Sequence, residues 1–207
     1  QYNSLITENG LRQIEALRAR FAELPIEACF ASDLYRTCKT AQSVYLTKNI
    51  PLRPDPRFRE TNVGRWEDTP FGYLERFEKQ DMDAFNHDEK NWHVDGSETW
   101  EDYTGRFIQG LDDVASRYDG KTIVIFSHAC VLRGVQKRIL KTDDLPFCEN
   151  TAVSRLCWRD GDVTFELLND ASHLMPEIST AIRQERLKHG AKDRADYSLW
   201  FEKQPEK

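Results

Sequence analysis

The segment Lys121-Thr-Ile-Val-Ile-Phe-Ser-His128 decides the fold class, because a strand ends and a helix begins within a few residues of it. Residues 122–126 are β-branched or aromatic throughout and predict a short buried strand. The residues that follow predict a helix, with apolar positions at helical spacing: Val131, Val135 and Ile139. A buried strand that runs through a polar pair into a helix is the repeating unit of an α/β fold.

The same pattern occurs earlier in the chain. A first amphipathic helix is predicted from apolar residues three or four positions apart: Leu11, Ile14, Leu17, Phe21 and Leu24. We expect Thr7 to cap this helix and Pro25 to end it. Residues 27–32 (EACFAS) predict a second buried strand, and Asp33 is expected to cap the helix that follows.

The remaining segments complete the predicted fold. Residues 51–95 predict irregular chain with a peripheral helix, and a clear amphipathic helix follows at Trp100, Tyr103, Phe107, Leu111 and Val114. Residues 154–168 predict a hairpin that turns at Asp160-Gly161. The tail from Ala171 is expected to be partly helical, with residues 199–201 (LWF) as an anchor. The sequence therefore predicts an α/β fold of three layers, a mostly parallel sheet flanked by helices.

Composition limits the class of protein. The 207 residues contain 39% hydrophobic residues and carry a net charge of −6, which favours one globular domain over residues 1–207 and argues against a nucleic-acid binder. No apolar run is long enough to cross a membrane. The five cysteines show no Cys-x-x-Cys spacing, which favours reduced thiols in a cytoplasmic protein. A homodimer is considered as the state of association, although the sequence does not identify it.

Polar side chains follow both predicted strands where the strands end. Arg36 follows the first strand and His128 the second, so both are expected in one crevice at the carboxyl edge of the sheet. Arg36 is either a solvated arginine paired with Asp33 or a guanidinium that binds phosphate. His128 is either a histidine bonded to backbone or a positioned imidazole in an anion site. Glu60, considered alone, is an ordinary surface carboxylate.

Five segments in this order resemble motifs of the histidine phosphatase (phosphoglycerate mutase-like) superfamily. They are residues 4–13 (SLITENGLRQ), 31–41 (ASDLYRTCKTA), 59–67 (RETNVGRWE), 96–99 (GSET, loosely) and 124–133 (VIFSHACVLR). In that family a histidine of an Arg-His-Gly motif attacks phosphorus and forms a phosphohistidine, which water or a second hydroxyl group then cleaves. Such covalent catalysis divides one difficult displacement into two easier ones.

The resemblance implies a role for each matching residue. Arg36 would bind phosphate oxygens, and His128 would complete the phosphate pocket as a hydrogen-bond donor. Glu60 would protonate the leaving alkoxide and then act as base for the attacking water. Ala129 would bring backbone close to the phosphate, where the family has glycine, and Gln1 would touch the substrate. The arginines and histidines supply the positive charge, so neither a metal nor an organic cofactor is expected.

One departure from the family concerns the nucleophile. None of the five histidines lies in an Arg-His-Gly tripeptide. We therefore expect the nucleophilic histidine in a strand encoded upstream of residue 1, so that the domain over residues 1–207 is N-terminally incomplete. The alternative is a non-catalytic module that binds phosphate or has a regulatory role.

A small helical lid insert is expected over residues 61–97. It contains four basic and nine acidic residues, a balance that would repel a bisphosphate. Its aromatic rings would either suit a less charged monoester or simply pack the insert: Trp66, Phe71, Tyr73, Phe77, Phe85 and Trp92. The sequence therefore predicts a phosphomonoester hydrolase acting on a small metabolite, with a cofactor-dependent phosphoglycerate mutase as the alternative.

Overall fold

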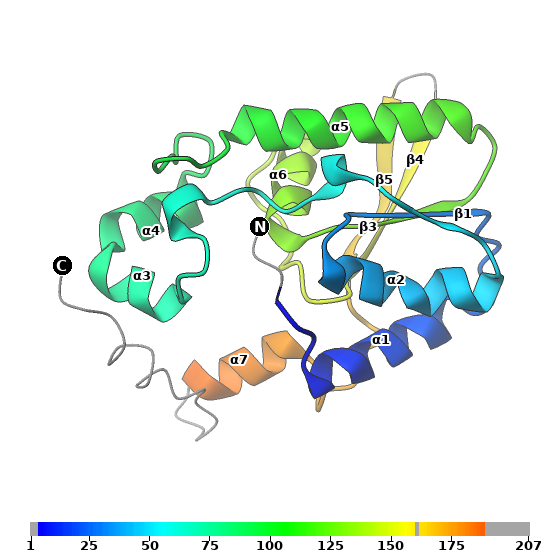
Figure 1. Cartoon of the computed structure of the whole chain (residues 1–207), viewed down its shortest axis with the longest axis horizontal. Coiled ribbons are helices and arrows are strands. Elements are labelled where there is room, and N and C mark those ends of the chain that lie inside the picture. The colour runs from blue at the N-terminus through cyan, green and yellow to red at the C-terminus, as the bar shows by residue number, and fades with distance from the viewer. Residues whose placement is uncertain (1–3, 160–161, 189–207) are drawn as a thin grey trace.

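The computed structural model describes residues 4–159 and 162–188. A parallel three-stranded sheet lies at its centre in the order β2-β1-β3, formed by Leu52–Pro54, Ala28–Ala31 and Ile123–Phe126. Helices α1 (Glu8–Phe21) and α2 (Tyr35–Lys48) lie below the sheet in Figure 1, and α5 (Trp100–Arg117) and α6 (Ala129–Leu140) lie above it. The predicted three-layer α/β fold is confirmed.

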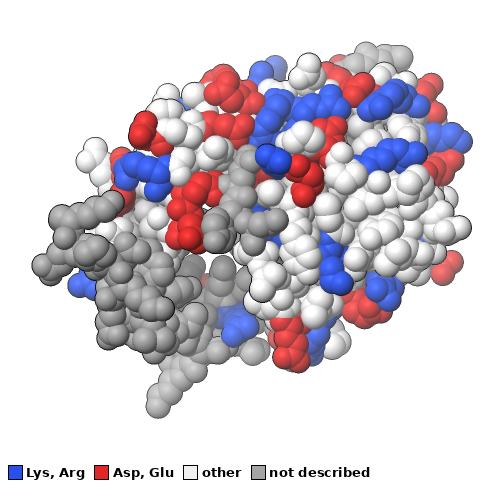
Figure 2. All heavy atoms as spheres, in the orientation of Figure 1, with Lys and Arg blue, Asp and Glu red and all other residues white. Residues whose placement is uncertain are grey.

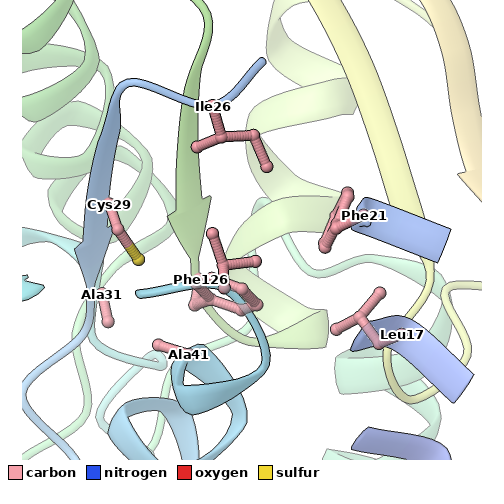
Figure 3. Close-up of a cluster of buried hydrophobic side chains, with 8 residues drawn as sticks. Leu17, Phe21, Ile26, Cys29, Ala31, Ala41 and Phe126 are labelled. Carbon is pink, nitrogen blue, oxygen red and sulfur yellow. The ribbon is translucent and has the colours of Figure 1, made fainter. Parts of the chain in front are cut away.

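Alternation along β1 explains why both faces of the sheet are covered. Cys29 and Ala31 point into a cluster with α1 and α2, together with Leu17, Phe21, Ala41 and Phe126 (Figure 3). Ala28 and Phe30 point the opposite way, into a cluster with α5 and α6. Successive side chains of a strand alternate between its two faces. All four residues of β1 are buried, so the strand is apolar throughout rather than alternately polar.

The predicted start of α1 is confirmed, because the Thr7 hydroxyl accepts a hydrogen bond from the Gly10 amide at 3.1 Å. The helix ends at Phe21, before Pro25 is reached. The prediction that Asp33 caps α2 is wrong. The N-cap is Leu34, without a side-chain cap, because both oxygens of Asp33 accept hydrogen bonds from Arg59 at 2.6 Å.

Residues 51–95 have more regular structure than the irregular chain and single peripheral helix that the sequence indicated. Strand β2 was not predicted, since it has only three residues and ends in a proline. Two short 3-10 helices follow, η1 (Pro56–Phe58) and η2 (Gly64–Trp66), and then α3 (Phe71–Phe77) and α4 (Lys79–His87). Some of the insert's rings pack in a small core of its own, which contains Trp66, Leu74, Met82, Trp92 and Val94, with Phe85 against it.

The C-terminal part contains the predicted hairpin as a separate antiparallel sheet of β4 (Val153–Arg159) and β5 (Asp162–Asp170). Its expected turn at residues 160–161, and the expected anchor at 199–201, lie outside the described residues. Helix α7 (Thr180–Lys188) follows. None of the helices in the described ranges combines the length and hydropathy that a membrane span requires. On the face shown in Figure 2, basic side chains are interspersed with acidic ones.

Candidate active site

The topology brings three segments to one edge of the sheet. Strands β1 and β3 are parallel neighbours, with Ala31 opposite Phe126, so their carboxyl ends coincide. Arg36 lies in the first turn of α2, five residues after β1, and His128 is the N-cap residue of α6, two residues after β3. Glu60 reaches the same place from the loop after η1. Arg36 and His128 therefore meet at the carboxyl edge of the sheet, as the strand ends predicted, and Glu60 lies near Arg36 there.

Arg36 and His128 are in direct contact. The Arg36 Nε donates to His128 Nδ1 at 3.2 Å, and His128 Nε2 lies 2.9 Å from the Ser32 hydroxyl oxygen. These contacts fit a neutral imidazole with its proton on Nε2. Burial, and then the charge of Arg36, lower the pKa of His128 to about 3. His128 is thus bonded to side chains rather than to backbone, and Asp33, considered from the sequence as a partner of Arg36, is bound by Arg59.

Glu60 is fixed by the first turn of α6. Its Oε1 accepts from the amides of Thr61 at 3.0 Å and Val131 at 2.9 Å, and its Oε2 accepts from the Cys130 amide at 3.2 Å. Loss of hydration raises the pKa of the carboxyl group, although these amides act in the opposite direction. A carboxyl group with a raised pKa, held firmly beside an anion-binding edge, suits proton donation.

The first-turn amides of α6 are partly used inside the protein. Free N–H groups at a helix N-terminus attract anions, and two of those of α6 donate to the Glu60 carboxylate. Ala129, the first residue of the helix, is exposed. Gln1, the other expected contact to substrate, lies outside the described residues.

Arg106 holds the segment that carries Glu60, a role that the sequence analysis did not assign. From α5 its guanidinium donates to the carbonyl oxygens of Arg57 and Arg59 at 2.8 Å and of Glu60 at 2.9 Å. It also forms an ion pair with Glu98 at 2.7 Å. The available signal was the loose motif at residues 96–99, because its glutamate lies eight residues before an arginine on the following helix.

The other histidines lie elsewhere. His87 and His93 are exposed on the insert. His173 contacts Arg20 at 2.9 Å and Thr151 at 3.3 Å, and so helps to hold the segment after β5 against α1. His189 lies outside the described residues.

Comparison with known proteins gives the family. The model of the histidine phosphatase superfamily (branch 1) matches residues 1–171, and the chain belongs to this superfamily. It is 26% identical over 178 residues to a metal-independent phosphoserine phosphatase of Arabidopsis thaliana, covering 84% of this chain and 74% of the relative. It is 27% identical over 183 residues to a probable phosphoglycerate mutase GpmB of Erwinia tasmaniensis, covering 84% and 85%.

Solved structures agree in fold. Bacillus stearothermophilus YhfR superposes with a TM-score of 0.78 at 24% identity, over 83% of this chain and 87% of that protein. A mycobacterial glucosyl-3-phosphoglycerate phosphatase superposes with a TM-score of 0.74 at 18% identity, over 83% and 90%. Both the expected family and the expected phosphoglycerate mutase-like architecture are confirmed.

Proposed function

We propose that this protein hydrolyses small phosphomonoesters through a phosphohistidine intermediate. The observation that carries the proposal is the Glu60 carboxyl group, held by the amides of Cys130 and Val131 beside the Arg36–His128 pair. The family supports enzymatic phosphoryl chemistry, and phosphomonoester hydrolysis fits the phosphatases among the relatives.

The chemistry requires two displacements. In the first, a histidine nitrogen bonds to phosphorus, the bond from phosphorus to the alcohol oxygen breaks, and Glu60 gives its proton to that oxygen. In the second, Glu60 removes a proton from water as the water oxygen bonds to phosphorus, and the bond between histidine and phosphorus breaks. Arg36 and the Nε2–H of His128 exchange their present contacts for phosphate oxygens, which spreads the developing negative charge. Ala129 and Gln1 complete the proposed phosphate and substrate contacts.

The nucleophile in this proposal is a histidine encoded upstream of residue 1. His128 is unsuited to the task, because its Nδ1 accepts from Arg36 and its Nε2 is directed to Ser32. Sequencing the upstream reading frame tests the point. An Arg-His-Gly tripeptide supports the hydrolase, and its absence favours the non-catalytic phosphate-binding alternative.

We propose that residues 61–97 act as a lid within a single domain. Their excess of acidic over basic residues favours a phosphatase over a mutase, because it would repel a bisphosphate. Some acidic residues of this insert are neutralised by ion pairs, such as Glu78 and Asp81 with Arg65. The buried rings at Trp66, Phe85 and Trp92 pack the insert's own core rather than line an open apolar site. The mutase remains the second candidate because a probable mutase is 27% identical to this chain.

The deciding experiment uses the protein encoded by the complete gene. Phosphate release from a panel of monoesters is compared with conversion of 3-phosphoglycerate to 2-phosphoglycerate in the presence of 2,3-bisphosphoglycerate. We expect hydrolysis to dominate, with an acid-labile, alkali-stable phosphoprotein trapped during turnover. Efficient mutase turnover with negligible hydrolysis would replace our proposal by its alternative.

We place the enzyme in the cytoplasm, with a small molecule rather than a nucleic acid or a membrane as its partner. All five cysteines are free thiols in the structure, which suits a reducing compartment. The proposed chemistry uses protein side chains alone and calls for no cofactor. Self-association as a homodimer is testable by sedimentation.

A further inference from the structure

The insert is built as a body of its own on a narrow base. In Figure 1 its helices α3 and α4 lie to the left of the sheet and of the helices that cover it. Its buried side chains pack in a core that is separate from the two clusters on the faces of the sheet. The two ends of the insert meet at Val63 and Ser97, which form an isolated antiparallel bridge. A body with its own core and one narrow base is able to move as a unit.

Away from this base, ion pairs connect the insert to the rest of the protein. The Nζ of Lys137, on α6, lies 2.9 Å from Oε1 of Glu89, and the two side chains are 5% and 12% exposed. Lys90 lies 3.7 Å from Asp143, which is 72% exposed. A pair as exposed as Lys90–Asp143 contributes little. The buried Lys137–Glu89 pair is therefore the ion pair that matters for the position of the insert.

The interface between the insert and the rest of the protein is incompletely packed. A cavity of about 40 Å³ lies there, with Thr61, Glu89 and Trp92 on the insert side and Cys130 on the other. Three polar atoms on the insert side are buried and form no hydrogen bond with any described residue: the Thr61 hydroxyl oxygen, the Trp92 indole nitrogen and Glu89 Oε1, which Lys137 approaches without the alignment of a hydrogen bond. Such groups destabilise the closed arrangement, and opening the interface would hydrate all three.

The Lys137–Glu89 pair is a contact of the kind that opens and closes. Taking two charges out of water is unfavourable, and this penalty largely offsets their mutual attraction. In the open arrangement both side chains would regain water. The pair therefore holds the insert against α6 with a small net free energy, although each charge strongly requires the other while the interface is closed.

The same interface reaches the candidate general acid. Thr61 and Cys130 both line the cavity, and their amides donate to the two carboxyl oxygens of Glu60 at 3.0 Å and 3.2 Å. Loss of hydration raises the pKa of Glu60, which favours the protonated form that proton donation needs. Opening the interface would admit water beside this carboxyl group.

We propose that Lys137 and Glu89 are positioning residues whose ion pair holds the insert closed over the site and thereby completes the surroundings of Glu60. The effect on catalysis rests on the proposed function, whereas the closing of the insert does not. Substrate enters and product leaves while the pair is broken, and Glu60 is shielded from water while the pair is formed. Closure of a lid over a site commonly controls turnover in this way.

Removing one charge of the pair tests the proposal in the complete-gene protein. Lys137→Met leaves Glu89 without its partner in the closed arrangement, so the insert should open and kcat/KM for phosphoserine should fall about tenfold or more. The loss for p-nitrophenyl phosphate should be smaller, because its phenol leaves readily without a proton from Glu60. Equal losses on the two substrates, or an unchanged kcat/KM for phosphoserine, would overturn the proposal.

A second variant and a matched control separate the pair from a general loss of stability. Lys137→Met combined with Glu89→Gln removes both charges, and most of the activity should return, because replacing a buried pair by uncharged groups is often nearly neutral. The control is Lys121→Met, since Lys121 pairs with Glu27 at 2.7 Å but the side chains are 52% and 43% exposed. It should change neither substrate's kcat/KM. A double variant no more active than Lys137→Met would contradict the pairing.

Hydrogen exchange detects the movement of the insert without turnover. In Lys137→Met the amides of residues 61–97 should exchange about tenfold faster or more, while the amides of β1 and β3 keep their protection. A pair that only stabilised the whole fold would lower protection in the sheet as well. Unchanged exchange in the insert, or equal acceleration in the insert and the sheet, would refute the proposal.

The two proposals fail in different ways. If the unchanged protein hydrolyses no monoester, p-nitrophenyl phosphate included, the proposed function is wrong, and hydrogen exchange still decides whether Lys137 and Glu89 hold the insert. If hydrolysis is found but the insert exchanges alike in Lys137→Met and the unchanged protein, the proposed function stands and the role of the pair is wrong.

Discussion

Replacing Arg106 by glutamine should destabilise the protein far more than the same change at an arginine elsewhere on α5. The guanidinium of Arg106 donates to three carbonyl oxygens, those of Arg57, Arg59 and Glu60, and to both oxygens of Glu98. Glutamine is too short to replace this fork, so the carboxylate of Glu98 and several carbonyl oxygens lose their partner.

The magnitude follows from burial. The Arg106 and Glu98 side chains are 19% and 24% exposed, so screening by water is limited, and removing one partner of a buried pair costs about 3–5 kcal/mol. Because some exposure remains, we expect the lower end, about 3 kcal/mol. The matched control is Arg117→Gln, since Arg117 pairs with Asp113 at 2.8 Å but the two side chains are 53% and 44% exposed. Such a surface pair is worth roughly 0–1 kcal/mol.

Urea unfolding followed by tryptophan fluorescence measures both variants. With a slope of about 2 kcal/mol/M, Arg106→Gln should lower the midpoint by about 1.5 M and Arg117→Gln by less than about 0.5 M. Activity should fall with Arg106→Gln even at low urea concentration, because the Glu60 backbone loses its anchor. Equal midpoints for the two variants would refute the role assigned to Arg106.

Two further predictions concern acid stability and the base of the insert. The folded-state pKa of His128, about 3, lies below its reference value of 6.5, so the unfolded chain binds more protons between these values and stability falls as pH drops through this range. Urea unfolding at pH 7 and pH 5 should show that the free energy of unfolding falls by about 1 kcal/mol per pH unit. His128→Gln should reduce this dependence on pH. The same dependence in the variant and the unchanged protein would contradict the prediction. Gly64→Ala should destabilise the protein, because Gly64 has φ +55° and a Cβ there would lie 2.2 Å from the Asp95 carbonyl oxygen. Gly72→Ala should not, because a Cβ on Gly72 meets nothing within 4 Å. Similar melting temperatures for these two variants would contradict the prediction, because the backbone around Asp95 would then have moved to accommodate the Cβ at position 64.

Much of the fold followed from local pattern. The runs at residues 28–31 and 123–126 are short, apolar and followed by helices, so strand type, helix positions and parallel pairing could be inferred together. β2 could not, because a three-residue strand ending in proline carries almost no periodic signal. Aspartate is a favoured N-cap residue, but the Asp33 side chain binds Arg59 from a distant loop instead of capping α2. The sequence around Asp33 does not indicate this contact.

The candidate site also contains some contacts that the sequence could predict and others that it could not. Arg36 and His128 were expected to meet because strand ends coincide, and they do. The contact of Glu60 with the amides of Cys130 and Val131 joins residues about seventy positions apart, and neither spacing nor propensity encodes it. The role of Arg106 depends on how the loop that carries Glu60 packs against α5, which only the three-dimensional structure reveals.

The central claim, that Glu60 protonates the leaving oxygen, is tested most directly by first-turnover kinetics of Glu60→Gln in the complete-gene protein. A rapid-quench experiment measures release of the alcohol from phosphoserine, which needs a proton, and of the phenol from p-nitrophenyl phosphate, which leaves readily without one. Loss of a general acid should slow the first release about 10²- to 10⁴-fold and the second much less. Equal slowing of both, or unchanged release of serine, would contradict the assignment.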